Sequence, residues 1–290
     1  MKTSNKLKNT PKISLLGIIG DPIKHSLSPA MHNAALEKLA LPYAYLPFQV
    51  SSKELKSFFL KAKKWNLVGF NVTIPHKEAV LLFLKKISPE AKLMGAVNTI
   101  YQKKGVWYGD NTDGRGYLTS LSTETKFHPR GKRIVILGAG GAARAVICSL
   151  ALKSPRAIIL LNRTEEKASA LAQEFSNKFK KIHFEALPLE KESCQIVFPD
   201  THLLINTTSI GLNGTHFDKL PLKHLPKTAI VSDLVYRPLK TKLLKQAEKL
   251  GLKIHPGIGM LLHQGALAFK LWTHHQPPLK IMQKALLDAL

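Results

Sequence analysis

A lysine and an aspartate, each set among polar and turn-forming residues, are the side chains of this sequence best suited to chemistry. Lys77 ends the string Asn71-Val-Thr-Ile-Pro-His-Lys77, and Asp113 follows 36 residues later in Gly109-Asp-Asn-Thr-Asp113-Gly114. An ammonium group beside a carboxylate can move a proton to or from a reacting oxygen. On spacing alone, a surface salt bridge is the commoner outcome for such a pair. The rest of the sequence must decide between the two.

A glycine turn in the second half supplies a candidate partner for that chemistry. An apolar strand leads into Gly138-Ala139-Gly140-Gly141-Ala142-Ala143. Gly138 permits a tight turn, Gly140 lets the backbone approach a pyrophosphate, and a helix beginning near Gly141 offers free N–H groups to phosphate. Ala143 replaces the usual third glycine and is still small enough for close helix packing. The pattern predicts a dinucleotide site rather than a purely structural turn.

The residues after the next predicted strand indicate which dinucleotide is bound. NAD sites usually place Asp or Glu there to bond the ribose 2′-hydroxyl. This chain instead has Asn162-Arg163-Thr164, with Lys167 one turn into the following helix. Cations suit a 2′-phosphate, and a guanidinium matches phosphate geometry. The sequence therefore favours NADP over NAD, with a plain surface role for Arg163 as the alternative.

Length and composition set the broad class. A chain of 290 residues with 44% hydrophobic content is typical of a globular protein of about two domains. It contains no apolar run of 18 or more residues, so we expect no membrane span and no exported leader. Its two cysteines, Cys148 and Cys194, have neither a metal-binding nor a disulfide-framework spacing, which fits a reducing cytoplasm.

The charge balance is strongly basic, with 43 Lys and Arg against 19 Asp and Glu, a formal net charge of +24. Nucleic acid, a membrane surface and anionic metabolites are all possible partners of such a chain. The lysines are scattered as pairs, without an arginine-rich block or an RNA-binding aromatic pattern, so we expect no specific nucleic-acid binding. A basic surface would attract an anionic substrate and a phosphorylated cofactor. Residues 1–12 are expected to form a disordered tail.

The order of predicted elements indicates an α/β protein with two units. The first unit reads as βαβαβ, for which a parallel sheet is the default, with strands at 14–18, 43–49 and 67–72 and helices at 28–39 and 51–63. In this reading Ser28 caps its helix and Pro29 takes the first helical position. A polar, glycine-rich stretch at 105–116 and a loop at 122–131 separate the units.

The second unit reads as a doubly wound nucleotide-binding sheet, with strands at 134–137, 157–161, 182–184, 203–206 and 229–233 and helices at 141–152 and 164–175. Two C-terminal helices, 260–272 and 279–290, carry too much apolar surface for a tail and are expected to fold back onto the first unit. The resulting fold class is an N-terminal α/β substrate-binding domain (1–113 with 256–290) plus a Rossmann-type doubly wound NADP-binding domain (114–255), with the active-site cleft between them.

Seven further motifs make the sequence similar to the shikimate dehydrogenase family. With the glycine turn they run in the family's order from about residue 15 to 275, and they comprise Gly20–Asn33, Asn71–Lys77, Ala96–Thr99, Asn111–Gly114, Asn206–Gly211, Asp233–Thr241 and Gly257–Ala266. The departures are mild: an N-terminal extension, Thr207 where alanine is common, Leu212 where methionine is frequent, and the basic excess. None of them touches Lys77 or Asp113.

The resemblance implies a role for each matching residue. Lys77 and Asp113 match the family's catalytic pair, Ser26 and Ser28 the serines that hold the substrate carboxylate, and Thr73, Asn98 and Gln264 the positions that bond ring hydroxyls. Tyr236 matches a further substrate position, although an aromatic beside a proline more often packs. The implied cofactor contacts are Gly138, Ala139, Gly140, Gly141, Ala142, Asn162, Arg163, Thr164, Lys167, Leu234 and Gly257.

The implied activity is the reversible NADPH-dependent reduction of 3-dehydroshikimate to shikimate, in aromatic amino-acid biosynthesis. No metal is expected, because the histidines lack a ligand spacing and a lysine can serve the alcohol. A relative that also oxidises quinate with NAD or NADP, a regulator that has lost turnover, and a nucleic-acid-binding module are the alternatives. The family contains monomers and dimers, and the sequence leaves that choice open.

Overall fold

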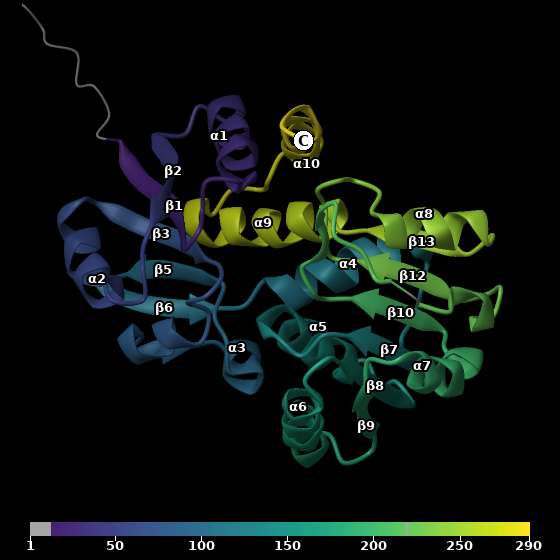
Figure 1. Ribbon diagram of the computed structural model, residues 1–290. Coiled ribbons are helices and arrows are strands. Elements are labelled where there is room, and N and C mark those ends of the chain that lie inside the picture. The colour runs from purple at the N-terminus through teal and green to yellow at the C-terminus, as the bar shows by residue number, and fades with distance from the viewer. Residues whose placement is uncertain (1–12, 219) are drawn as a thin grey trace, which may run out of the picture.

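The structure, a computed structural model, describes residues 13–218 and 220–290 (Figure 1). The tail expected to be disordered, residues 1–12, lies outside the described residues. Two six-stranded sheets lie side by side, and helices α4 (Asp113–Thr125) and α9 (Ile258–Thr273) run between them (Figure 1). The α/β class and the Rossmann-type second unit predicted from the sequence are confirmed.

The first sheet is mixed rather than parallel. Its strands are β1 (Ser14–Gly20), β2 (Tyr43–Gln49), β3 (Leu67–Val72), β4 (Lys86–Ile87), β5 (Thr99–Lys103) and β6 (Val106–Asp110), in the order β2-β1-β3-β5-β6-β4. Strand β1 is parallel to β2 and β3, as expected, but β5 is antiparallel to both β3 and β6. The parallel pairing expected for the three predicted strands is confirmed, and the antiparallel part of the sheet comes from β5 and β6, which were not predicted as strands.

A two-residue turn explains the antiparallel pairing of β5 with β6. Lys104 and Gly105 join β5 to β6 with φ angles of +51° and +72°, the backbone that matches the twist of a β-hairpin. So short a connection allows only antiparallel pairing. As a result the carboxyl ends of β1, β3 and β6 and the amino end of β5 all meet at one edge of the sheet.

The second sheet is wholly parallel and doubly wound. Its order is β13-β12-β10-β7-β8-β9, the arrangement of dinucleotide-binding domains, with strands β7 (Arg133–Leu137), β8 (Ala157–Asn162), β9 (His183–Pro188), β10 (Leu203–Asn206), β12 (Ile230–Asp233) and β13 (Lys253–Pro256). Alternate residues of β7 enter opposite cores: Ile134 packs under α5 (Gly141–Ala151) and α6 (Glu165–Lys178), and Val135 under α7 (Lys191–Val197) and α8 (Lys242–Lys249).

Helices α4 and α9 cross tightly where a loop was expected. The stretch 105–116 was predicted to separate the units, yet residues 113–125 form α4. Gly114 packs against Ser149 of α5, and Gly116 against the backbone of Gln264 in α9. These glycines allow the helix backbones to come into contact. Glycines are also common in loops, which is why this segment was predicted to be a loop.

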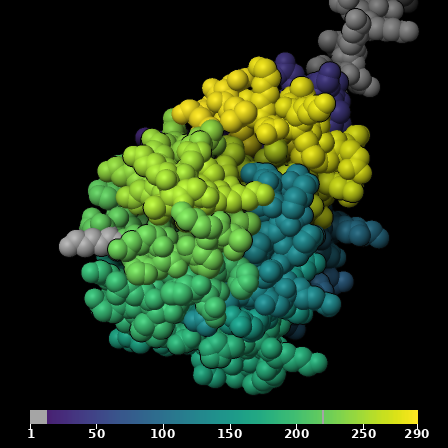
Figure 2. Space-filling view, turned by 90° about the vertical axis from the view of Figure 1, so that its right-hand side faces the viewer, coloured from purple at the N-terminus to yellow at the C-terminus, as the bar shows by residue number. Residues whose placement is uncertain are grey.

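The C-terminal helices fold back onto the first sheet, as expected. Phe269 and Trp272 of α9 and Met282 of α10 (Leu279–Asp288) share a core with Leu16 of β1 and Met31 of α1 (Ser28–Lys38). The Trp272 indole N–H donates to the Ile100 carbonyl at 2.9 Å. In the turned view the yellow C-terminal residues adjoin the teal residues around α4 (Figure 2).

The remaining elements are short. They are α2 (Leu55–Lys64), α3 (Pro89–Met94), β11 (Ile210–Asn213) and single 3-10 turns at Ala79–Phe83, Phe198–Asp200 and Leu222–His224. Within residues 13–218 and 220–290, no helix combines the length and the low polarity that crossing a membrane requires.

The α4–α9 contact predicts the effect of adding one methyl group. A Cβ atom at Gly116 would lie 2.5 Å from the Gln264 nitrogen and 2.8 Å from its Cα, and backbone cannot yield as a side chain can. We expect Gly116→Ala to lower the free energy of unfolding by about 2 kcal/mol, as overpacking does. Denaturant unfolding measures it. The exposed Ser122→Ala on the same helix is the control, and equal stability of the two variants would contradict the tight crossing.

Candidate active site

The predicted catalytic pair forms a partly buried ion pair. Lys77, in the turn after β3, places Nζ 2.6 Å from Oδ2 of Asp113, the first residue of α4. The side chains are only 17% and 9% exposed. An exposed pair contributes little to stability and is freely solvated, whereas this pair is enclosed on most sides. Its burial is typical of an active-site ion pair and not of a surface salt bridge.

Two of the predicted substrate residues join the pair directly. Asn98 donates through Nδ2 to Asp113 Oδ1 at 2.7 Å, and the same nitrogen lies 3.4 Å from Oε1 of Gln264. Gln264 comes from α9, and its own amide nitrogen donates to the Leu261 carbonyl. Four residues that are far apart in the sequence thus form one connected polar group.

The serine pair lies at the start of α1, with one correction to the sequence reading. Leu27, not Ser28, is the N-cap residue, and no side chain makes a capping hydrogen bond there. Ser28 is the first helical residue, is 4% exposed, and lies near the Tyr45 hydroxyl, whose pKa it lowers against the larger effect of burial. Its backbone N–H donates to Ser26 Oγ at 3.3 Å. Capping therefore does not engage the Ser28 hydroxyl.

Thr73 and Tyr236 occupy different surroundings. Thr73 follows β3 at the same sheet edge as Lys77, with its methyl group against Gly20 at the end of β1. Tyr236 follows β12 of the second sheet but packs against the core of the first, which includes Ile18 and Met31. Burial raises the pKa of the Tyr236 hydroxyl. The packing role foreseen for Tyr236 is present, and its substrate role remains a prediction.

The glycine turn adjoins Lys77. Gly138 has a φ of +105°, donates its N–H to the Leu161 carbonyl at 2.8 Å, and would place a Cβ atom 2.8 Å from Thr207 Oγ1. A Cβ atom at Gly140 would meet nothing within 4 Å, and one at Gly141 would lie 4.0 Å from Lys77 Cδ. The turn is thus open where a pyrophosphate would bind, and the positive end of α5 lies beside the lysine. Ala139 and Ala142 are partly exposed in the same turn.

The predicted 2′-phosphate residues follow β8 at the same edge. Asn162 Nδ2 donates to the Thr164 carbonyl at 2.7 Å, which holds the turn into α6. Arg163 and Lys167 are both exposed. Two acidic residues, Glu165 and Glu166, share the first turn of α6 with Lys167 and are also exposed. The side chains of Arg163 and Lys167 are therefore accessible to a ligand, and the two nearby carboxylates partly offset their positive charge.

Leu234 and Gly257, the remaining predicted cofactor residues, contact each other. They follow β12 and β13, and a side chain at Gly257 would overlap the Leu234 carbonyl. Only glycine permits this approach of the two strand ends. The structure therefore gives Gly257 a packing role, and its contact with a cofactor remains a prediction.

A buried aspartate that the sequence reading left without a role ties together the loops at this edge. Asp233, 1% exposed, accepts hydrogen bonds from Asn206 Nδ2, the Val235 N–H and the Thr241 hydroxyl. Burial raises the pKa of its carboxyl to about 6, against the opposing effect of these donors. Asn206 also donates to the Ile210 carbonyl, so one polar pair holds both loops.

Sequence reasoning also gave no role to a set of polar residues beneath the ion pair. They are nearly or completely buried, they occur within the recognised motifs, and they comprise Asn71, Thr99, Asn111 and Thr112, together with Tyr45 on β2. A usable signal existed for Asn71, which is a polar residue in an otherwise apolar strand and therefore needs a buried partner.

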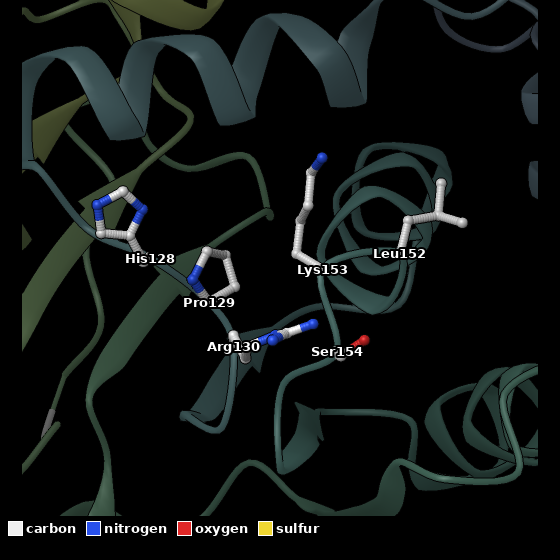
Figure 3. A pocket seen from close by; sticks show the side chains of 6 residues that line it. All are labelled: His128, Pro129, Arg130, Leu152, Lys153 and Ser154. Carbon is white, nitrogen blue, oxygen red and sulfur yellow. The ribbon is translucent and has the colours of Figure 1, made fainter.

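A surface hollow of about 250 Å³ lies at the opposite edge of the second sheet. His128, Pro129 and Arg130 precede β7, and Leu152, Lys153 and Ser154 follow α5 (Figure 3). In a parallel sheet the site is expected beyond the carboxyl ends of the strands. This hollow adjoins their amino ends, so it does not belong to the group around Lys77.

The fold and this group of residues define a class of protein. A doubly wound dinucleotide-binding sheet, with its glycine turn against a buried lysine–aspartate pair from a second α/β unit, is the framework of a dinucleotide-dependent oxidoreductase. Within residues 13–218 and 220–290, no three His, Cys, Asp or Glu side chains gather as metal ligands would. The expectation of a metal-free site stays a prediction.

Comparisons with known proteins identify the family. Residues 18–100 match the shikimate dehydrogenase substrate binding domain, 121–208 shikimate / quinate 5-dehydrogenase, and 257–287 the shikimate 5′-dehydrogenase C-terminal domain. The shikimate dehydrogenase (NADP(+)) of Methanopyrus kandleri is 44% identical over 280 residues, 96% of each chain. This chain belongs to the shikimate dehydrogenase family, as the motifs predicted, and is an oxidoreductase.

Two solved structures extend the likeness to three dimensions. A shikimate dehydrogenase in complex with NADP+ is 41% identical, has a TM-score of 0.87, and matches over 96% of each chain. The shikimate 5-dehydrogenase of Listeria monocytogenes, in complex with shikimate and NAD, is 38% identical with a TM-score of 0.88, over 96% of this chain and 97% of the other. The likeness covers both units and the helices between them.

The raised pKa of Asp233 predicts a pH dependence of stability. Because its folded pKa, about 6, exceeds the ordinary 3.8, the folded state holds this proton more tightly than the unfolded chain does. The stabilisation from protonated Asp233 is complete below about pH 4 and declines as pH rises to about 6, by on the order of 3 kcal/mol. Asp233→Asn should remove that decline from the unfolding free energy between pH 4 and 7. Exposed Asp218→Asn is the control, and parallel curves for Asp233→Asn and wild type would refute the assignment.

Proposed function

We propose that the protein catalyses the reversible NADPH-dependent reduction of 3-dehydroshikimate to shikimate, a step of aromatic amino-acid (chorismate) biosynthesis. The observation that carries this proposal is the Lys77–Asp113 pair, held 2.6 Å apart with the start of α5 beside it. Relatives that match this chain over nearly their whole length are named for this activity.

In this mechanism Lys77 is the proton donor. When bound, NADPH would supply the hydride for the ring carbonyl carbon, and the carbonyl oxygen would then gain negative charge. The Lys77 ammonium stabilises that oxygen and transfers a proton to it, which completes the alcohol. Asp113 holds Lys77 in place through Oδ2. In the oxidative direction the neutral Lys77 amine accepts the alcohol proton.

The polar groups around the pair would bind the substrate. Ser26 and Ser28 hold the carboxylate, since hydroxyls can donate to an anion without a fixed counter-charge, and capping leaves Ser28 available. Thr73, Asn98 and Gln264 bond the ring hydroxyls. A site that satisfies several hydroxyls discriminates against analogues that lack them, because its own buried polar groups would be unpaired. Tyr236 closes the site from the second unit.

The second unit would bind NADP. The open turn at Gly138–Ala142 receives the pyrophosphate at the positive end of α5. Exposed Arg163 and Lys167, with Asn162 and Thr164 shaping the turn, receive the 2′-phosphate. Leu234 and Gly257 line the nicotinamide side. The Methanopyrus kandleri relative carries NADP(+) in its name, and one neighbouring structure holds NADP+.

A broader specificity is the second candidate. The family model for residues 121–208 describes shikimate and quinate enzymes together, and one similar structure contains NAD. The acidic pair in the first turn of α6 would weaken 2′-phosphate binding and so favours some use of NAD. In this alternative the same residues oxidise quinate and shikimate with either cofactor.

We also propose a domain division, a location, a metal content, an oligomeric state and a set of partners. Residues 1–113 with 256–290 bind the substrate, and residues 114–255 bind NADP. The protein works in the cytoplasm without a metal ion. It is a monomer or a homodimer. Neither specific nucleic acid nor a membrane is needed for its activity.

Initial rates with four substrate pairs test the proposed function. Shikimate or quinate is offered with NADP+ or NAD+, and nicotinamide reduction is followed. We expect shikimate with NADP+ to have the highest kcat/KM. The best rate with quinate and NAD+, or no turnover by any pair, would refute the proposal.

Removal of the lysine should affect the chemical step. We expect Lys77→Ala to lower kcat by about 100-fold or more with a modest change in KM, because its interaction belongs mainly to the transition state. Lys153→Ala, an exposed lysine of the distant hollow, is the matched control and should keep the wild-type rate. A variant with weaker binding and nearly normal kcat would show that Lys77 serves only to bind.

Removal of the arginine should affect one cofactor only. We expect Arg163→Ala to raise KM for NADP+ by about 10-fold to 100-fold and to leave KM for NAD+ nearly unchanged, since a charge-assisted contact to the 2′-phosphate is lost. The exposed Arg130→Ala is the control. Equal effects on both cofactors would assign Arg163 to the shared part of the dinucleotide.

A further inference from the structure

A series of hydrogen bonds between buried side chains, here called the chain, leads from Tyr45 to the Lys77–Asp113 ion pair. Tyr45 and Thr99 are 0% exposed and Asn71 is 4% exposed, and the mechanism above uses none of them. The Tyr45 hydroxyl donates to Asn71 Oδ1 at 2.8 Å, Asn71 Nδ2 donates to Thr99 Oγ1 at 3.2 Å, and the Thr99 hydroxyl lies 2.8 Å from Asn98 Oδ1. Asn98 then donates to Asp113.

Two backbone groups determine which way this chain runs. The Thr112 N–H can only donate, and it meets Asn98 Oδ1 at 2.7 Å, so the Asn98 amide nitrogen must face Asp113. The Asn98 carbonyl can only accept, and it meets Asn71 Nδ2 at 3.1 Å, so Asn71 Oδ1 must face Tyr45. Neither amide can rotate by half a turn without losing a backbone partner.

The Thr99 hydroxyl joins the two amides. It accepts from Asn71 Nδ2, and it lies 2.8 Å from Asn98 Oδ1 and 3.1 Å from Thr112 Oγ1. Because an amide oxygen can only accept, the shorter contact requires the Thr99 hydroxyl to donate to Asn98 Oδ1. Every donor runs in one direction, from Tyr45 toward Asp113, and the chain ends where Lys77 occupies the other carboxylate oxygen. Aligned hydrogen bonds in a buried setting reinforce one another.

We propose that Thr99 is a positioning residue for the reaction. It acts through Asn98, which holds Oδ1 of Asp113 so that Oδ2 faces Lys77, and this role rests on the proposed function. At the other end of the chain, Ser28 lies near the Tyr45 hydroxyl and partly offsets the rise in its pKa that burial causes. The chain therefore runs from the neighbourhood of the serine proposed to receive the substrate carboxylate to the carboxylate that orients the proton donor.

The register of the first sheet makes this link possible. Asn71 of β3 lies opposite Thr99 of β5, and Thr99 lies opposite Asp110 at the end of β6. Thr99 is thus paired with both neighbouring strands at the edge where the site forms. Its side chain is placed by two ladders and has little freedom to compensate for a lost partner.

Removal of the hydroxyl at constant shape tests the proposal. We expect Thr99→Val to lower kcat by about tenfold or more with a smaller change in KM for shikimate, because small misplacements of a catalytic group are costly in the transition state. Thr99→Ser, which keeps the hydroxyl, should restore most of the rate. Thr201→Val is the matched control: its buried hydroxyl bonds the Val197 carbonyl, away from the site, so stability can fall while kcat stays the same.

A double-mutant cycle separates positioning from general support. If Thr99 acts through Asp113, the loss caused by Thr99→Val should largely vanish in an Asp113→Asn background, measured at high enzyme concentration. Equal losses in both backgrounds, or a normal kcat for Thr99→Val, would overturn the proposal. A failure of Thr99→Ser to recover the rate would do the same.

A measurement without turnover keeps this test separate from the substrate assignment. The side-chain amide of Asn98, followed by NMR, should exchange with solvent at least tenfold faster in Thr99→Val than in wild type or Thr99→Ser. An unchanged exchange rate contradicts the proposal. If wild type oxidises neither shikimate nor quinate, the proposed function fails, while this exchange rate still decides the role of Thr99.

Discussion

The cost of burying the carboxylate of Asp113 governs the arrangement of the site. A buried charge must be paired and hydrogen-bonded, and Asp113 meets this requirement with an ammonium on one oxygen and an amide on the other. The amide donor, Asn98, is itself held by a backbone N–H and a threonine hydroxyl. Compensation of one charge therefore arranges the turn after β3, the start of β5 and the start of α4 around the reacting position.

Contact between α4 and α9 brings the two halves together. Asp113 begins α4 and Gln264 lies in the middle of α9, so the helices that join the sheets also carry side chains of the site. Glycines at 114 and 116 let α4 lie directly against α5 and α9. The same approach brings the start of α5, and with it the dinucleotide turn, next to Lys77. The same helix contacts thus pack the two sheets together and position the residues of the site.

The sequence predicted the second unit more completely than the first. Apolar strands alternating with helices, and a glycine turn after β7, predict a parallel sheet, because each helical crossover is long enough to return the chain for a strand in the same direction. In the first unit the Lys104-Gly105 turn and the glycines of α4 have a local sequence pattern that is compatible with more than one structure. A short polar, glycine-rich segment is typical of a loop, a hairpin turn or a tight helix crossing, and only contacts with distant residues distinguish them.

The residue types of the site were determined by the sequence itself. The chemistry of Lys77, Asp113, the glycine turn and Arg163 can be inferred without a fold, and the family resemblance adds Asn98 and Gln264. Only the tertiary structure decided that Ser28 does not cap its helix, that Tyr236 packs on the opposite unit, and that Asn71, Thr99 and Tyr45 extend the site inward. The physical reason is that hydrogen-bond direction and burial depend on strand register and helix packing, which join residues that are distant in sequence.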